Sequence, residues 1–296
     1  MHNKFLLLCL MAFAMLIGCG QGSNSAENGG SGPSRSIQNK GSDTLVNVAL
    51  AWAERYRDVD PSTSIAVTGG GSGTGIAALI NGTVDIANAS RAMKQKEFDA
   101  AAENGVEAVE FVVAIDALAI IVHPDNPVDQ LTIPQMSDIY TGRITNWSEV
   151  GGKDEAIVLL SRETNSGTHV YFLEEVVRRG EKENTDIFAP QTLLMPSSVG
   201  ITSELRRNPN AIGYDGLGYV DEAHEKIVYV AVDDSSPFVK PSVASASDGS
   251  YPIARNLYMY TAGQPEGVTL EYLDWIRGAE GQDIVLSLGF VPLPSE

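Results

Sequence analysis

Three short segments of the sequence place hydroxyl groups and glycines between a predicted strand and a predicted helix. They are residues 41–44 (GSDT), 69–75 (GGGSGTG) and 161–168 (SRETNSGT). The start of a helix carries unpaired N–H groups and a partial positive charge, so it attracts anions, and glycine lets the backbone approach a ligand closely. Ligands bind at the carboxyl ends of the strands in open α/β sheets, where all three turns lie. The spacing therefore predicts a site for a small anion.

One arginine in the third segment strengthens this prediction. The planar guanidinium of Arg162 matches two oxygens of a tetrahedral oxyanion. Taken singly, Ser42 or Asp43 would be interpreted as an ordinary helix cap. The glycine run also departs from nucleotide motifs, because no lysine follows it and Ile76 stands where the dinucleotide fingerprint requires a small residue. Together, the three turns and Arg162 favour a single oxyanion over a nucleotide.

The elements that must position these turns alternate between strand and helix patterns. Strands are expected at residues 36–41, 64–68, 84–89, 156–160, 211–214, 226–232 and 256–261. Helices are expected at residues 43–59, 76–81, 94–104, 134–141, 167–179, 199–207, 268–277 and 281–288. The apolar run 109–122 suits a buried strand pair or a crossover, and the small, polar segment 242–250 suits a loop. This order predicts an α/β fold with a mostly parallel sheet and helices on both faces.

The N-terminus predicts export. Lys4 precedes thirteen apolar residues, too few for a membrane-spanning helix but typical of a signal peptide. Residues 16–19 (LIGC) resemble a bacterial lipobox, whose cysteine is lipidated and becomes the new N-terminus. We therefore expect a signal peptide over residues 1–18, lipidation of Cys19 and a flexible polar tether over residues 19–35. The lipid would anchor the protein on the periplasmic or cell-surface side of a membrane without spanning it.

Composition limits the partners and cofactors. The chain has 296 residues, of which 43% are hydrophobic, and a formal net charge of −18. This charge argues against binding nucleic acid, but not against one small anion in a closed site, because salt screens remote charges beyond about 8 Å. Cys9 and Cys19 are the only cysteines, so the body has no disulfide, and no residues have metal-ligand spacing. No cofactor is expected.

Other conspicuous residues have simple structural interpretations. The three tryptophans, Trp52, Trp147 and Trp275, are expected to be packing residues rather than residues that stack on a ligand. His169 adjoins the third segment but is more simply interpreted as a helix residue that points outward.

The motifs also resemble a known family. Residues 41–44, 71–75, 89–91 and 166–168 together with Arg162 occur in the order and spacing of the substrate-binding proteins of high-affinity phosphate ABC transporters. Residues 140–147 (YTGRITNW) resemble another segment of this family, and the resemblance covers about residues 37–292.

The resemblance implies a type II periplasmic-binding-protein fold. Two α/β lobes, joined by two crossovers, would close around the ligand in a central cleft. Lobe 1 would comprise residues 36–115 and 251–296, and lobe 2 residues 116–250. Hinges are expected near residues 114–117 and 250–255.

The resemblance also implies which residues bind phosphate. The implied site residues are Asp43, Thr44, Ser72, Ser90, Arg91, Arg162, Ser166, Gly167 and Thr168. Arg162 would be the charged clamp, and the hydroxyl and N–H groups would donate hydrogen bonds.

Arg91 departs from the family pattern. Better-known members have an aspartate at this position, which accepts the proton of hydrogen phosphate and repels sulfate. Arg91 would instead add a second positive charge. Asp43 and Asp116 are then the candidate proton acceptors, although Asp116 could simply pair with Arg91.

The implied function is extracytoplasmic binding of inorganic phosphate and its delivery to the membrane permease subunits of an ABC transporter, by a monomer that is not an enzyme. Three alternatives remain: a binding protein for sulfate, molybdate or tungstate, a secreted phosphatase-like hydrolase, and a signalling or scaffold lipoprotein. No paired nucleophile and base supports the hydrolase.

Overall fold

The computed structural model describes residues 35–294. The predicted signal peptide, Cys19 and residues 20–34 of the predicted tether lie outside the described residues. No helix in the described part of the chain is both long enough and apolar enough to cross a membrane.

The strands of residues 35–294 form one mixed sheet. They are β1 (Arg35–Gly41), β2 (Thr63–Thr68), β3 (Ile86–Ala89), β4 (Ala108–Val122), β5 (Gln130–Thr132), β6 (Val158–Arg162), β7 (Leu193–Met195), β8 (Ala211–Gly216), β9 (Lys226–Ala231) and β10 (Ala254–Ala262). The strand order is β2-β1-β3-β10-β4-β8-β6-β7, with β9 also paired to β4 and β5 paired to β9.

Helices of several kinds connect the strands. The α-helices are α1 (Val46–Val59), α2 (Ser72–Ile80), α3 (Gln95–Glu103), α4 (Ile133–Tyr140), α5 (Gly167–Phe172), α6 (Ser198–Leu205), α7 (Val243–Ser247), α8 (Gly267–Arg277) and α9 (Ala279–Ser287). The 3₁₀ segments are η1 (Asp43–Leu45), η2 (Trp147–Val150) and η4 (Leu217–Tyr219), and η3 (Leu173–Val177) is a π-helix.

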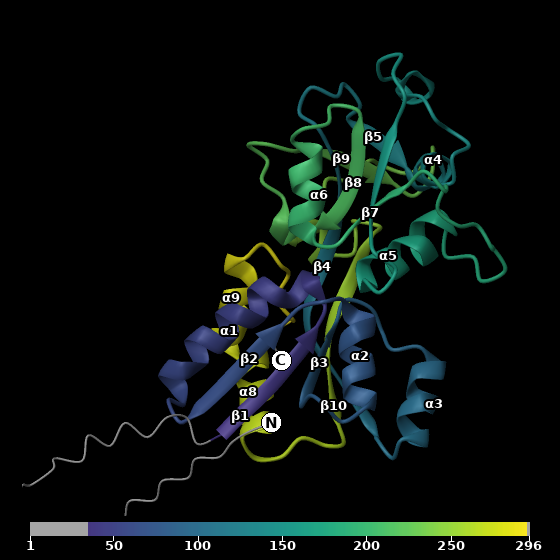
Figure 1. Ribbon diagram of the computed structural model, residues 1–296. Helices are drawn as coiled ribbons and strands as arrows, with labels where there is room; N and C mark the ends of the chain where they lie inside the picture. The colour runs from purple at the N-terminus through teal and green to yellow at the C-terminus, as the bar shows by residue number, and fades with distance from the viewer. Residues whose placement is uncertain (1–34, 295–296) are drawn as a thin grey trace, which may run out of the picture. The chain divides into compact units, whose positions relative to one another are not determined.

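Strand β4 is shared between two lobes. Its first part, up to Ala117, pairs with β10, and its second part, from Leu118, pairs with β8 and β9. We call the half of the sheet formed by β2, β1, β3, β10 and the first part of β4 lobe 1, and the half formed by the rest of β4 with β8, β6, β7, β9 and β5 lobe 2 (Figure 1). Of the two interpretations of the apolar run at residues 109–122, the crossover is therefore confirmed.

The expectation of a mostly parallel sheet is wrong at these crossovers. Strand β1 is parallel to β2 and β3, and β6 is parallel to β7 and β8. Strands β4 and β10 are antiparallel to their neighbours. The reason is that β4 leaves lobe 1 for lobe 2 and β10 returns beside it, so the two strands must run in opposite directions.

Helices cover both faces of the sheet in each lobe (Figure 1). In lobe 1, α1, α8 and α9 enclose a core around Trp52 on one face, and α2 packs Ile76 on the other. In lobe 2, α6 packs Ile201 on one face, and α4 and α5 enclose Tyr140 and Phe172 on the other. This packing leaves the carboxyl ends of β1, β2, β3 and β6 free to carry the turns of the site.

The packing role predicted for the tryptophans is confirmed. Trp52 and Trp147 are fully buried, and their indole N–H groups donate to the carbonyls of Gly281 and Asn210 at 2.8 and 2.9 Å. Trp275 packs edge-on against Tyr56.

Several helix boundaries differ from the predicted ones. Helix α2 begins at Ser72 rather than at residue 76, because Gly70 and Gly71 complete the turn with φ of 113° and 92°. The segment 242–250 was expected to be a loop but contains α7, where the Ser242 hydroxyl accepts from Ser245 N at 3.0 Å. The three-residue strands β5 and β7 were not predicted, because they are too short to show a periodic pattern.

Candidate anion-binding site

The first and third predicted segments meet at Arg162. Strand β6 ends at this residue, whose side chain is only 1% exposed. Arg162 Nη2 donates to Asp43 Oδ2 at 2.9 Å, and Asp43 begins the 3₁₀ turn that follows β1. Because β1 belongs to lobe 1 and β6 to lobe 2, this ion pair joins the two lobes.

Ser198 is a site residue that the sequence analysis missed. Arg162 Nη1 donates to Ser198 Oγ at 2.9 Å, and Ser198 N donates to Asp43 Oδ2 at 3.0 Å. Ser198 begins α6 directly after β7, so it belongs to a fourth strand–turn–helix unit of the same design. The signal was the pair of serines at residues 197–198, but β7 was too short to be recognised as a strand.

Asp215 is a second missed residue beneath Arg162. It is fully buried at the end of β8, and its Oδ1 accepts from Ser198 Oγ at 2.9 Å and from Gly216 N at 2.8 Å. Burial raises the pKa of Asp215 to about 6, against the lowering effect of the Arg162 charge. Arg162 is thus held between Asp43 and the Ser198–Asp215 pair, which fixes its guanidinium in one position.

The first and third helix starts also meet through two threonines. The hydroxyls of Thr44 and Thr168 lie 2.9 Å apart, and both side chains are buried. Ser166 caps α5 by accepting from Thr168 N at 3.2 Å. This cap uses one of the first N–H groups of the helix and fixes the position of Thr168.

The second segment lies against Gly167. Ser90 N donates to Ser72 Oγ at 3.0 Å, and the two serine hydroxyls lie 3.3 Å apart. A Cβ at Gly167 would collide with Ser72 Oγ and would lie 2.6 Å from Ser90 Oγ. Only glycine lets the start of α5 approach these hydroxyls so closely.

The loop before α5 is docked on the glycine run. Asn165 Nδ2 donates to the Gly70 carbonyl at 2.9 Å, and Gly73 N donates to the Asn165 carbonyl at 3.0 Å. A Cβ at Gly71 would lie 2.8 Å from the Asn165 carbonyl oxygen. Together with the Arg162–Asp43 pair, these contacts hold the two lobes together around the site.

Arg91 is not joined to this network by any hydrogen bond among the described residues. Its Nη1 and Nη2 donate to the two carboxylate oxygens of Glu97 at 2.8 and 2.7 Å. The suggested pairing of Arg91 with Asp116 is therefore wrong. Asp116 pairs instead with Arg255, whose Nη2 lies 2.9 Å from Asp116 Oδ2. Glu97 neutralises Arg91 because Glu97 lies in the first turn of α3 and Arg91 in the segment just before that helix.

His169 does not point outward, contrary to its interpretation from the sequence. The side chain is buried, its Nδ1 lies 3.0 Å from Ser161 Oγ, and Ser161 Oγ lies 2.5 Å from the Tyr214 hydroxyl. Burial lowers the pKa of His169. The histidine faces the core because α5 packs this side against lobe 2, where His169 contacts the ring of Phe188.

The arrangement offers many hydrogen-bond donors and one flanking carboxylate. The predicted site residues in this contact network are Asp43, Thr44, Ser72, Ser90, Arg162, Ser166, Gly167 and Thr168. Hydroxyls, helix-start N–H groups and one guanidinium are the donor set that holds an oxyanion, and Asp43 can accept a proton from it. Within residues 35–294, no group of three or more His, Cys, Asp or Glu side chains could hold a metal ion.

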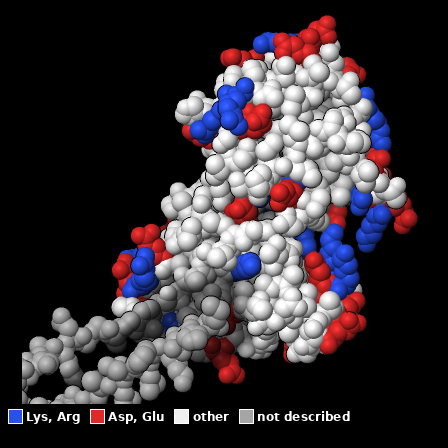
Figure 2. Space-filling model, viewed as in Figure 1, with Lys and Arg blue, Asp and Glu red and all other residues white. Residues whose placement is uncertain are grey.

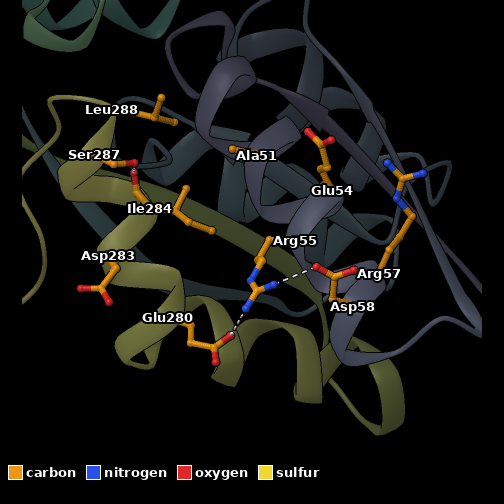
Figure 3. A pocket seen from close by; sticks show the side chains of 10 residues that line it. All are labelled: Ala51, Glu54, Arg55, Arg57, Asp58, Glu280, Asp283, Ile284, Ser287 and Leu288. Carbon is orange, nitrogen blue, oxygen red and sulfur yellow. Dashed lines mark hydrogen bonds and ion pairs between the residues drawn. The ribbon is translucent and has the colours of Figure 1, made fainter.

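A groove elsewhere on lobe 1 is a poor anion site. It lies between α1 and α9, and Figure 3 shows Arg55 in it, held by Asp58 at 2.8 Å and near Glu280 at 3.9 Å. The lining has four acidic residues against two arginines. On the face shown in Figure 2, acidic and basic side chains are interspersed, without a continuous basic patch. The hydrogen-bond donors around Arg162, between the two lobes, are therefore the better candidate for the anion site.

Comparison with known proteins defines the class first. Residues 25–280 match the family model described as a PBP superfamily domain. This match and the fold identify a two-lobed binding protein of the periplasmic-binding class, so the predicted fold class is confirmed.

Relatives with names then define the family. The phosphate-binding protein PstS of Pseudomonas aeruginosa is 32% identical over 283 residues, covering 90% of this chain and 85% of that protein. PstS of Bacillus subtilis is 31% identical, covering 98% and 94%. A structure of a phosphate ABC transporter substrate-binding protein with bound phosphate, from Clostridium perfringens, has 32% identity and a TM-score of 0.78, covering 87% and 99%. The chain belongs to this family of phosphate-binding proteins, as the motifs predicted.

Proposed function

We propose that the protein binds inorganic phosphate outside the cytoplasm and delivers it to the permease of an ABC transporter. The observation that carries the proposal is the buried guanidinium of Arg162, which lies where helix starts from both lobes meet. The PstS relatives and the phosphate-bound structure from Clostridium perfringens support phosphate as the oxyanion.

The donor set is adequate for useful affinity. A charge-assisted hydrogen bond contributes roughly 1.5–3 kcal/mol. A micromolar dissociation constant corresponds to about −8 kcal/mol. Two contacts from Arg162 and several from hydroxyl and N–H groups reach this value after the cost of ordering the lobes.

Asp43 is the carboxylate that we assign to the ligand's proton. Its Oδ2 accepts from Arg162 and Ser198, while its Oδ1 faces the glycine run, 3.2 Å from where a Cβ of Gly69 would lie. The other candidate, Asp116, is fully buried and bonded to Arg255 through Oδ2, whereas Asp43 is 22% exposed. A carboxylate beside the ligand accepts a hydrogen bond from hydrogen phosphate and repels sulfate, which has no proton to donate.

The lobes would open and close about the two crossovers. We retain the segments 36–115, 116–250 and 251–296 as a proposed division of the chain. In support, the pairing of β4 changes partner between Ala117 and Leu118, and the returning strand β10 begins at Ala254. Hinge motion at these strands would admit and release the ligand.

Lipidation at Cys19, anchoring to a membrane surface and a monomeric state complete the proposal. They rest on the N-terminal sequence, the polar segment after Cys19 and the family resemblance. An acyl anchor would keep the protein close to the permease without a membrane-spanning helix.

We assign the protein no catalytic activity. The hydrolase alternative has one observation in its favour, the hydrogen-bonded pair Ser161 and His169. However, Ser161 is fully buried and its hydroxyl also contacts Tyr214, so it is poorly placed to attack a substrate. Turnover of a chromogenic phosphate ester would favour the hydrolase instead.

Calorimetric titration of the purified protein with phosphate tests the proposal. Phosphate should bind at a micromolar or lower dissociation constant, in competition with arsenate and only weakly with sulfate. The competition is repeated at two pH values, on either side of the second ionisation of phosphate. The comparison shows whether affinity depends on the protonation state of the ligand. Tighter binding of sulfate, molybdate or tungstate than of phosphate would contradict the proposal and establish the other-oxyanion alternative.

A further inference from the structure

Two buried charges of opposite sign lie directly opposite each other on the crossover strands. Asp116 on β4 and Arg255 on β10 are register partners at the end of the lobe 1 pairing. Their side chains are 0% and 3% exposed, and Arg255 Nε and Nη2 donate to Asp116 Oδ2 at 3.2 and 2.9 Å. A buried pair of this kind is weak evidence for stability, because desolvation offsets its attraction. The presence of the Asp116–Arg255 pair on the crossover strands therefore needs an explanation other than stability.

The same arginine reaches the candidate site. Arg255 Nη2 also donates to Thr168 Oγ1 at 2.9 Å, and Thr168 Oγ1 lies 2.9 Å from Thr44 Oγ1. A continuous chain of contacts thus runs from Asp116 on a crossover strand to a hydroxyl of each lobe.

This contact fixes the direction in which the Thr168 hydroxyl donates. A guanidinium has only donors, so Thr168 Oγ1 must accept from Arg255. Its single hydrogen must then point elsewhere, to Thr44 or to a bound oxyanion. When the oxygen of a hydroxyl accepts a hydrogen bond from a cation, the hydroxyl is polarised. Its own hydrogen then forms a stronger hydrogen bond to an acceptor.

Helix α5 is tied to the same crossover strand at a second point. The guanidinium of Arg255 lies 5.2 Å from the ring centre of Tyr171, and the Tyr171 hydroxyl donates to the Ala254 carbonyl at 2.9 Å. The start of α5, with Ser166 and Thr168, is therefore held against β10 by contacts of both Arg255 and Tyr171.

We propose that Arg255, held by Asp116, is a positioning residue for phosphate: it orients the Thr168 hydroxyl as a donor to the ligand and couples the crossover strands to the ligand's presence. This inference rests on the proposed phosphate site. Arg91 was expected to add a second positive charge to the site, but it is bonded to Glu97. Arg255 supplies that second positive charge instead.

The test separates positioning from stability. Arg255→Met alone leaves Asp116 as an uncompensated buried charge, so it can fail to fold. The double variant Arg255→Met/Asp116→Asn removes both charges. We expect this variant to retain most of the wild-type free energy of unfolding, measured in urea. Its phosphate affinity, measured by calorimetry, should be weaker by about tenfold or more, because the hydrogen bond from the oriented Thr168 hydroxyl to the charged ligand is lost.

A double-mutant cycle with Thr168 supplies a readout that a purely structural role would not change. Thr168→Val in the wild type should weaken phosphate binding about tenfold. In the Arg255→Met/Asp116→Asn background the same change should cost less than about twofold, because the hydroxyl is no longer oriented. Full additivity of the two effects would contradict the proposal.

The matched control is the Arg206–Glu225 pair. Arg206 Nε donates at 2.7 Å to Glu225, a carboxylate that is fully buried on lobe 2. Arg206→Met/Glu225→Gln should leave phosphate affinity unchanged. Equal affinity losses in the two double variants would assign Arg255 a structural role only, and wild-type affinity in Arg255→Met/Asp116→Asn would also overturn the inference. In either case the proposed function would stand, whereas a wild type that does not bind phosphate would overturn both.

Discussion

Arg162 and Asp43 are 119 positions apart in the sequence, yet Arg162 Nη2 donates to Asp43 Oδ2 at 2.9 Å across the two lobes. Asp43 is partly accessible, at 22% exposure, whereas Arg162 is 1% exposed. The cation is thus fixed by lobe 2, and the carboxylate that meets it belongs to lobe 1. If the lobes open about the two crossovers as proposed, we expect this ion pair to break.

Arg162→Ala should abolish phosphate binding. It removes the charged donor at the centre of the site, and the loss of two charge-assisted hydrogen bonds corresponds to at least about a hundredfold weaker binding. Calorimetry measures the loss, and far-ultraviolet circular dichroism checks the fold.

Arg143→Ala is the control for this prediction, because Arg143 also contacts both oxygens of one carboxylate, Asp186, but lies half-exposed outside the site. It should bind phosphate as the wild type does. Unchanged affinity in Arg162→Ala would show that the anion binds elsewhere.

Asp43→Asn should reduce discrimination rather than binding alone. The amide can no longer accept the ligand's proton as a carboxylate does and no longer repels sulfate. The ratio of sulfate to phosphate dissociation constants should fall about tenfold or more, the size of one charge-assisted hydrogen bond. Competition titrations measure the ratio, with Asp85→Asn as a control outside the site. A ratio equal to that of the wild type would remove Asp43 from the role of proton acceptor.

Gly167→Ala should prevent tight closure without unfolding either lobe. The added Cβ would collide with Ser72 Oγ, so lobe 1 and the start of α5 could no longer approach. We expect phosphate affinity to fall about tenfold or more while stability changes little. Gly200→Ala, whose Cβ would meet Met195 at an ordinary 3.4 Å, is the control. Wild-type affinity in Gly167→Ala would mean that the ligand does not require this approach.

Asp215 should make stability decrease as pH rises. Burial raises its folded-state pKa from 3.8 to about 6. Between these values the folded protein keeps a proton that the unfolded chain has released, so the stabilisation is fully present below 3.8 and is lost as pH rises through about 6. The effect amounts to at most about 3 kcal/mol.

Asp215→Asn removes this dependence. Relative to the wild type, its free energy of unfolding in urea should increase between about pH 4 and about pH 7. The comparison must be made as a difference, because carboxylates with lowered pKa, such as the partly exposed Asp186, act with the opposite sign in both proteins. A constant difference across this range would show that Asp215 is ionised throughout.

Cys19→Ser tests the anchor. Without the thiol no acyl chain can be attached, so the protein should move from the membrane fraction to the soluble extracytoplasmic fraction. Phosphate binding by the body should not change. Persistence in the membrane fraction after a high-salt wash would point to a different mode of attachment.

The strand-end turns were predictable from the sequence because each consists of neighbouring residues with a local signature. Hydroxyls and glycines before a helix identified Asp43, Ser72 and Gly167 as parts of one site, and the family resemblance added Ser90 from another strand end. The alternation of strands and helices likewise predicted the α/β class.

Partners distant in the sequence could not be predicted. Nothing near Asp215 or Arg255 indicates that they lie beneath the site, since their positions depend on how β8 and β10 pair. Arg91 illustrates the same point, because its partner Glu97 was only one of several carboxylates within reach. The antiparallel crossovers also required knowing that two distant segments, β4 and β10, run side by side.

The sharing of β4 has a consequence for how the protein denatures. One continuous strand of fifteen residues completes the sheets of both lobes. If either lobe unfolded, β4 would lose its pairing partners in that lobe. Apolar residues of β4, such as Leu118, would then be exposed to water, and the sheet of the other lobe would be destabilised. The two lobes should therefore unfold together in a single cooperative transition, although their cores are separate. We therefore expect that neither lobe folds when it is expressed alone.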